Sequence, residues 1–210
     1  MKLQRVGVVA VLAVMLLLQN VSAQLLESWE NTLDGWTVQD ANYTPGFTTK
    51  FGVTDQTYSL SLTGTAGPTY GQMLLSPFVA GWTSIIGNAA SLSLDIYTPP
   101  ASFGYYLQFD VDLNNADAGF TSIDGYSYPA TVIGSEYTWT YAIPAAYAAV
   151  LATSSNPTQI AIQIGGGYTD GNEVMYLDNL RVTPVPEPST IALLGLGLLG
   201  LVGLARRRVS

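Results

Sequence analysis

The sequence predicts an all-β domain of antiparallel strands, arranged as a sandwich or a barrel. Apolar residues alternate with polar or small ones in several short segments, turn-forming residues flank each segment, and helical patterns are nearly absent. The clearest segments are 58–64, 91–98, 105–113, 137–143, 159–165 and 174–182. Weaker strands are expected at 25–29, 36–39, 47–53 and 72–75, and only 145–152 has a helical pattern. Many short strands without intervening helices favour antiparallel sheets over a parallel α/β fold.

The N-terminus has the order of a secretory signal peptide, which we assign to residues 1–23. Two basic residues, Lys2 and Arg5, come first. An apolar run then covers 6–18, and small residues precede an expected cleavage after Ala23. This run is shorter than the roughly 20 residues that a membrane span needs, which disfavours a permanent N-terminal anchor. The sequence therefore predicts an exported protein.

The C-terminal segment, 185–210, predicts a short transmembrane helix with a distinctive entrance. Its parts, in order, are the tetrapeptide Val185-Pro186-Glu187-Pro188, an apolar stretch at 190–205, and the basic residues Arg206, Arg207 and Arg208. As a helix the stretch would be about 24 Å long, less than the roughly 30 Å of a hydrocarbon core. The arginines would place the C-terminus in the cytoplasm and the preceding domain outside.

This order of parts resembles the PEP-CTERM sorting signal of Gram-negative bacteria that make extracellular polysaccharide. The resemblance implies an exosortase-type processing protease as a partner, with cleavage near the Pro-Glu-Pro motif. It also implies a protein that is anchored in the inner membrane during sorting and then reaches the cell surface or the extracellular matrix. The sequence alone is compatible both with removal of the helix and with its retention.

The segment between these two signals, 24–184, has the length of one domain. It holds two basic residues, Lys50 and Arg181, against fourteen acidic ones. Such a surface repels nucleic acid and anionic lipid headgroups, but not neutral glycans or divalent cations. The chain has no Cys and no His, which excludes disulfides, a Ser-His-Asp triad, a cysteine nucleophile and a His-bound zinc site.

Two segments of this domain, 27–36 (ESWENTLDGW) and 176–182 (YLDNLRV), resemble the first and last strands of jelly-roll carbohydrate-binding modules and related galactose-binding-like sandwiches. The resemblance implies a jelly-roll-like β-sandwich. It also implies a structural Ca²⁺ held by Glu30 and Asp178, with Glu27 as a substitute for Glu30, and carboxylates are suitable Ca²⁺ ligands. The alternatives are that these acids face solvent on their strands, or that Asp178 makes a turn.

A candidate ligand-binding face lies on the segment 105–113. Asp110 and Asp112 are two residues apart, so a strand would place both on one face, together with Tyr106 and opposite the apolar residues. Sugar rings have apolar C–H faces that stack on aromatic planes, and their hydroxyls bind carboxylates and amides. Tyr106, Asp110 and Asp112 are therefore the candidate glycan-binding residues.

These features favour a non-catalytic protein that binds glycan outside the cell. Two other functions stay open: a structural matrix or surface-coat protein that self-associates, and a carboxylate glycosidase, because Asp110 and Asp112 fall within the spacing that glycoside hydrolysis requires. Aromatic residues are abundant in the second half of the domain, but they also build sandwich cores. For Trp139, which alternates with Tyr137 and Tyr141 on one strand face, we expect core packing.

Overall fold

The computed structural model describes residues 22–39, 43–64, 67–68, 72–100, 108–123, 134–165, 168–169, 174–185 and 197. The chain divides into two compact units, Ala23–Pro184 and a second unit that combines 1–22 with 185–210. The fold below is that of the first unit. Residues 1–21 of the predicted signal peptide lie outside the described residues, as does the predicted helix at 190–205 apart from Gly197. Within the described ranges, no helix is long and apolar enough to cross a membrane.

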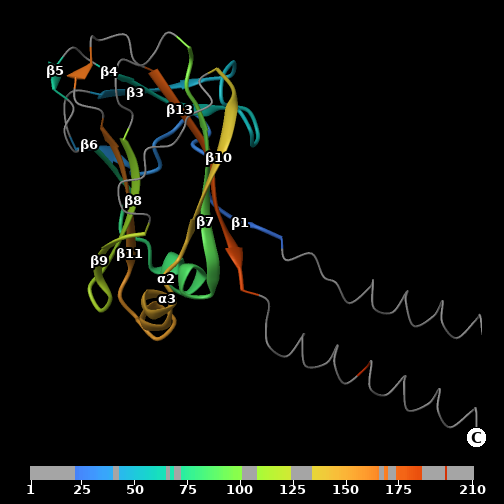
Figure 1. The fold of residues 1–210 in the computed structure, drawn as a ribbon, viewed down its shortest axis with the longest axis vertical. Helices are drawn as coiled ribbons and strands as arrows, with labels where there is room; N and C mark the ends of the chain where they lie inside the picture. The colour runs from blue at the N-terminus through green and yellow to red at the C-terminus, as the bar shows by residue number, and fades with distance from the viewer. Residues whose placement is uncertain are drawn as a thin grey trace, which may run out of the picture. The chain divides into compact units, whose positions relative to one another are not determined.

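The domain is a sandwich of two antiparallel sheets, as the strand pattern predicts (Figure 1). The six strands of sheet A are, in order, β10 (Glu136–Ala142), β7 (Ala89–Tyr97), β13 (Val174–Pro184), β4 (Ser59–Gly64) and β3 (Tyr43–Thr48), with β1 (Gln24–Glu27) also paired to β13. The five strands of sheet B are, in order, β2 (Thr37–Val38), β6 (Gln72–Leu75), β11 (Thr158–Gly165), β8 (Gln108–Asn115) and β9 (Gly119–Ser122). A separate short pair joins β5 (Gly67–Pro68) to β12 (Tyr168–Thr169).

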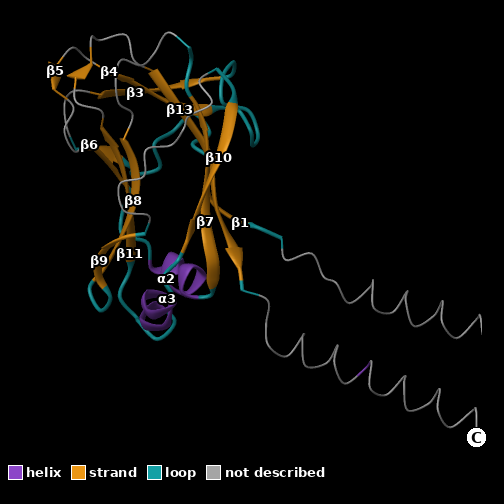
Figure 2. Ribbon diagram, viewed as in Figure 1, coloured by secondary structure: helices purple, strands orange, loops and turns teal. Residues whose placement is uncertain are grey.

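The core lies between the two sheets and is built from alternate residues of each strand. Leu92 and Leu94 of sheet A and Val111 and Leu113 of sheet B point inward and are at most 1 % exposed. Two short helices, α2 (Ala80–Gly87) and α3 (Ala145–Leu151), lie at one end of the sandwich (Figure 2). Neither of these two helices covers the outer face of a sheet.

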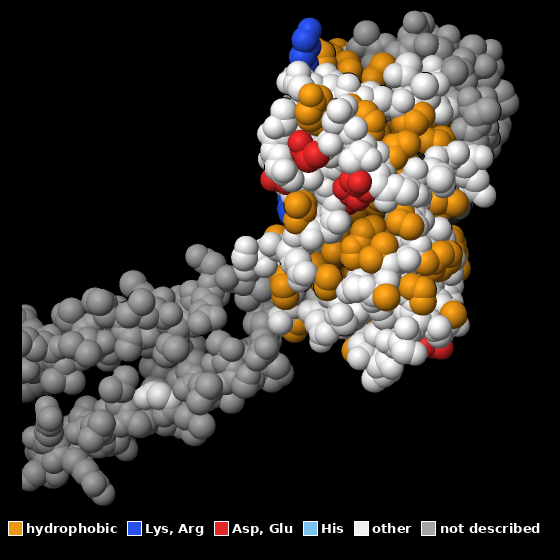
Figure 3. Space-filling view, turned by 180° about the vertical axis from the view of Figure 1, so that it is seen from behind, with side chains coloured by type: hydrophobic (Ala, Val, Ile, Leu, Met, Phe, Trp, Pro, Cys, Tyr) orange, Lys and Arg blue, Asp and Glu red, His pale blue; other side chains and the backbone are white. Residues whose placement is uncertain are grey.

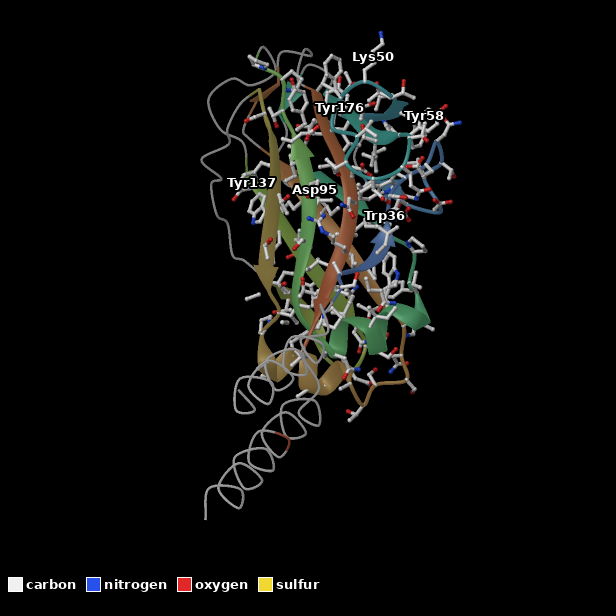
Figure 4. The ribbon with its side chains drawn as sticks, turned by 90° about the vertical axis from the view of Figure 1, so that its right-hand side faces the viewer. Trp36, Lys50, Tyr58, Asp95, Tyr137 and Tyr176 are labelled. Atoms are coloured by element: carbon white, nitrogen blue, oxygen red, sulfur yellow. The ribbon has the colours of Figure 1, made fainter. Side chains whose placement is uncertain are left out.

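Aromatic side chains contribute to this core, as expected for Trp139. Trp139 is 5 % exposed, and its ring stacks on that of Tyr141 at 4.8 Å between centroids, so the core prediction is confirmed. Tyr137, expected on the same buried face, is 41 % exposed. It lies near the start of β10 (Figure 4), which is an edge strand of sheet A among the described residues.

The elements that differ from those predicted include helix α2, strand β3 and the short strands β5, β9 and β12. Helix α2 was not expected, because in eight residues the only helical signal is the four-residue spacing between the buried Trp82 and Ile86. Strand β3 covers Tyr43–Thr48 instead of 47–53. Pro45 hides this strand from a propensity argument, yet Pro is tolerated at a sheet edge, where β3 lies. The remainder of the predicted strand begins a loop.

Candidate functional site

The predicted Asp110 and Asp112 lie on the outer face of sheet B. In β8 they alternate with Val111 and Leu113, which point into the core and are 0 % exposed. The strand therefore alternates as the sequence predicts. Tyr106, the third predicted residue, lies outside the described residues. That these side chains bind a ligand stays a prediction.

The two carboxylates have different surroundings. Asp110 accepts hydrogen bonds from the Ser122 hydroxyl at 2.7 Å and from the backbone N–H of Val111 at 2.8 Å. Asp112 is 2 % exposed, and no donor in the described part of the chain reaches its Oδ2. Burial, followed by the negative charge of Asp110, raises the pKa of Asp112 to about 6, although Ser122 partly offsets the rise. Asp112 is thus a buried carboxyl with spare hydrogen-bonding capacity.

Amide side chains flank the carboxylates on the same face. Asn114 donates from Nδ2 to Gln159 Oε1 at 3.3 Å, and Gln159 donates from Nε2 to the Ser76 carbonyl at 2.9 Å. Gln163 lies opposite Asp110 in the register of β11 and β8, which puts it on this face as well. Amides carry both donors and acceptors, so they match sugar hydroxyls in either direction.

An aromatic side chain at the edge of this face was not predicted. Phe120 of β9 lies opposite Asn114 in the register of β8 and β9 and is 60 % exposed. Directly opposed residues of an antiparallel pair share a face, so this ring stands beside the amides and carboxylates. Its strand has only four residues, too few for an alternation signal. We call the group the Asp112–Phe120 face; it comprises Asp110, Asp112, Asn114, Phe120, Ser122, Gln159 and Gln163.

The outer face of sheet A carries a carboxylate with a full set of partners. Asp95 forms a two-pronged ion pair with Arg181, and both nitrogen–oxygen distances are 3.0 Å. It also accepts hydrogen bonds from the hydroxyls of Thr138 at 2.6 Å and Thr54 at 2.7 Å. Burial alone would raise the pKa of Asp95, but these hydrogen bonds and the guanidinium charge outweigh it and lower the pKa below its usual value. Figure 4 shows Asp95 near the middle of this face.

A loop at 49–58, which we call the strap, is fastened to the domain by two more carboxylates. Asp178 of β13 accepts the backbone N–H groups of 54–55 at 2.7 and 2.8 Å. Glu30 accepts those of 57–58 at 3.1 and 3.2 Å. Asp178 is 0 % exposed, and burial raises its pKa although the backbone N–H bonds act against the rise. Both residues therefore hold the strap in place.

These contacts do not fit the calcium site predicted at Glu30 and Asp178. A Ca²⁺ shell gathers oxygen ligands around one centre, whereas both carboxylates here face N–H donors, including that of Asn179 at 2.8 Å from Asp178 Oδ1. Glu27, the substitute ligand, accepts the indole N–H of Trp36 at 3.1 Å. In the described ranges, no group of three or more acidic, His or Cys residues could hold a metal ion. Calcium binding at these residues is untested, the contacts disfavour it, and chelation can test it.

The C-terminal segment gives the decisive match to known proteins. Residues 184–208 match the PEP-CTERM protein-sorting motif. This chain carries a PEP-CTERM sorting signal. The match includes the Val185-Pro186-Glu187-Pro188 tetrapeptide and the three arginines, as the sequence resemblance implies. No curated protein matches the PEP-CTERM chain in sequence.

Solved structures with a similar fold are mostly carbohydrate-binding β-sandwiches. One, described as a carbohydrate-binding module of the β-sandwich superfamily, has a TM-score of 0.56 at 16 % identity and covers 77 % of this chain and 61 % of its own. The CBM27-1 module of Caldicellulosiruptor saccharolyticus, solved with mannohexaose, has a TM-score of 0.56 at 16 % identity and covers 80 % and 100 %. An exo-β-agarase has a TM-score of 0.50 at 17 % identity and covers 78 % and 25 %.

These likenesses establish the fold of the PEP-CTERM protein as a jelly-roll-like sandwich of the carbohydrate-binding-module type. The chain spans about three fifths of the first of these structures and the whole of the CBM27-1 module. The structural similarity confirms the fold class that the sequence predicts. Because the sequence identities are only 16 %, these structures do not identify a ligand, which has to be inferred from the side chains.

Proposed function

We propose that this PEP-CTERM protein is a non-catalytic, exported protein that binds glycan through the Asp112–Phe120 face. The observation that carries the proposal is the placement of the exposed Phe120 ring beside the amide side chains of Asn114 and Gln159. A pyranose ring can stack its C–H face on Phe120. Its hydroxyls can then bind the half-buried amides of Asn114 and Gln159.

The surface chemistry of the domain supports a glycan over other ligands. Fourteen acidic residues against two basic ones disfavour nucleic acid and anionic membranes. Figure 3 shows that, on the face it presents, charged side chains are sparse and apolar ones gather in the middle. Neutral polyols are compatible with the charge balance of the domain. The fold, shared with a module solved with mannohexaose, is compatible with this ligand class.

The test is retention of the protein in gels that contain soluble polysaccharide, both neutral and acidic, including that of the producing cell. We expect Phe120→Ala to weaken retention about tenfold, because the stacking plane is lost. Phe78→Ala is the matched control, since Phe78 is 53 % exposed but precedes α2. Equal losses in the two variants, or no retention of the wild-type chain on any polymer, would overturn the proposal.

We also propose that an exosortase-type protease processes the sorting signal. The chain would first be anchored in the inner membrane with the domain outside and would then be released to the cell surface or the matrix. Mass spectrometry of the mature C-terminus tests this. A mature chain that ends near Pro186 to Pro188 supports cleavage, whereas one that still ends at Ser210 supports a permanent anchor.

Two alternative functions have their own tests. The first alternative is a matrix protein that self-associates. Exposed apolar side chains such as Phe51 and Phe78, at 46 % and 53 % exposure, are compatible with it because they could be buried between copies. Light scattering that shows a monomer at all concentrations would exclude that function. A carboxylate glycosidase is disfavoured because Asp110 and Asp112 are only 3 % and 2 % exposed, which leaves little access for a glycosidic bond. Release of reducing ends from a polysaccharide by the protein would show that it is a glycosidase after all.

A further inference from the structure

We propose that Phe51, Tyr97 and Tyr176, on the outer face of sheet A, form a second glycan-contact surface. One domain would then hold two glycan strands, one on each sheet. The ligand class rests on the function proposed above, while the site rests on residues that the Asp112–Phe120 face does not include. We call these three residues the aromatic cluster.

The aromatic cluster is a set of three rings in mutual contact. The rings of Phe51 and Tyr97 are parallel to within 3°, with 5.9 Å between centroids. Tyr176 lies 5.6 Å from Phe51 and 5.9 Å from Tyr97. Tyr97 and Tyr176 are direct partners in the register of β7 and β13. Despite these contacts, Phe51 is 46 % exposed, so a wide part of its surface is open to a ligand.

The strap fixes Phe51 in this position. Gly52 has φ +65°, and a Cβ at this residue would lie 2.7 Å from the Cβ of Tyr176. The strap backbone therefore packs directly against sheet A, next to the aromatic cluster. The Phe51 carbonyl accepts a hydrogen bond from the Ser59 hydroxyl, and Asp178 holds the strap two residues after Gly52. Rings held in place in this way lose little conformational entropy when a ligand binds.

The surroundings of the aromatic cluster favour a sugar as its occupant. Tyr97 and Tyr176 add phenol hydroxyls to the apolar rings, so the cluster offers both ring faces and hydrogen-bonding groups. Lys50 precedes Phe51 in the chain and is exposed, and Figure 4 shows it at the same end of the sheet as Tyr176. It can donate to sugar hydroxyls or to the carboxylate of a uronic acid. Nucleic-acid bases also stack on aromatic rings, but the net negative charge of the domain opposes them.

The rest of the outer face of sheet A is polar and borders the aromatic cluster. Farther along sheet A, Ser93 and Thr140 hydrogen-bond to each other at 3.1 Å, and Asp95 is paired with Arg181 at 3.0 Å. These groups already have partners, so we place the ligand at the aromatic cluster. A ligand that stacks there would lie at the strap end of the sheet, away from α2 and α3 (Figure 1).

The experiment is calorimetric titration of the full chain, held in a non-glycosidic detergent. The probes are mannohexaose, a soluble polyuronate and the extracellular polysaccharide of the producing cell. We expect Phe51→Ala to remove one of two binding events or to weaken it about tenfold, and Phe51→Tyr, which keeps the ring plane, to restore it. Phe78→Ala, a second exposed phenylalanine at 53 %, is the control. Lys50→Ala should weaken the polyuronate alone if that is the ligand.

The outcomes separate this inference from the proposed function. If Phe51→Ala binds like the wild type while Phe120→Ala loses binding, the second surface is overturned and the first stands. If only Phe51→Ala loses binding, the aromatic cluster is the glycan site and the Asp112–Phe120 face is not. If Phe51→Ala abolishes self-association in light scattering and leaves glycan binding intact, the occupant is a second copy of the chain and the inference is wrong. Binding of no probe by the wild-type chain overturns both.

Discussion

Buried carboxylates on the outer faces of the two sheets differ in how many hydrogen-bond partners they have. On sheet A, Asp95 is surrounded by a guanidinium and hydroxyls, and the carboxylate of Asp178 accepts backbone N–H groups. On sheet B, Asp112 is equally buried, yet its Oδ2 has no partner within the described ranges. Buried polar groups in folded proteins nearly always have partners, so an exception calls for an explanation. The sheet A carboxylates help to hold the fold together, whereas the sheet B carboxyl is buried without a full set of hydrogen-bond partners.

The difference also appears in the pKa values. Hydrogen bonds and the Arg181 charge overcome burial and lower the pKa of Asp95, so its contribution to stability is present above its unfolded pKa and is lost as the pH falls through the folded value. Burial and the charge of Asp110 raise the pKa of Asp112 to about 6. Ionised Asp112 therefore costs the folded state free energy that ionised Asp95 does not.

The largest effect is expected from Asp178→Ala. The substitution leaves the strap N–H groups of 54–55 without their acceptor, and each buried donor without a partner costs about 1 to 3 kcal/mol. We expect the free energy of unfolding to fall by about 3 kcal/mol in urea denaturation. The control is Glu136→Ala, which removes an exposed acid from the same sheet and should change little. A loss as small as in the control would contradict a structural role for Asp178.

Much of this comparison could not be predicted from the sequence. The sequence predicts that Asp110 and Asp112 share one face, because side chains two residues apart on a strand point to the same side. The contact between Asp178 and Thr54 joins residues 124 positions apart, and no local pattern encodes it. The resemblance to carbohydrate-binding modules implied that Glu30 and Asp178 are calcium ligands, which stays untested, and their N–H partners become visible only once the strap is folded over sheet A.

The exposure of Phe51 and Phe120 could not be predicted from the sequence either. Phe51 falls in the segment 47–53, which alternates like a strand, whereas the structure ends β3 at Thr48 and makes a loop of the rest. Phe120 lies in a four-residue strand, where one aromatic residue carries no period. In both cases exposure is decided by a turn, and turns that depend on tertiary contacts leave weak signals in a single sequence.

An effect of opposite sign is expected from Asp112→Asn. Between about pH 4, the unfolded pKa, and the folded pKa of about 6, the folded state keeps a proton that the unfolded state has released. The stability of the wild type should therefore fall as the pH rises through this window and stay level above it. The variant removes the charge and should be more stable by about 1 to 3 kcal/mol at pH 7.

Urea denaturation between pH 4 and pH 8 measures this effect. The control is Asp110→Asn, in which the hydrogen bonds from Ser122 and Val111 are disturbed, and we expect it to gain less stability than Asp112→Asn. If Asp112→Asn destabilises the domain at pH 7, then Asp112 has partners in solution. The contrast between the two faces would then be lost.

The smallest effect is expected from removal of calcium, and it tests the sheet A side of the comparison directly. A ligand that binds only the folded state must raise stability, so calcium at Glu30 and Asp178 would raise the melting temperature, and a chelator would reverse the rise. Because the strap N–H groups already face these carboxylates, a cation would have to displace donors that hold the strap. We therefore expect the melting temperature to be the same in millimolar calcium and in chelator, within about 1 °C. A calcium-dependent rise that Glu30→Gln abolishes would show that the strap rearranges to present carbonyl oxygens, and sheet A would then hold a metal site.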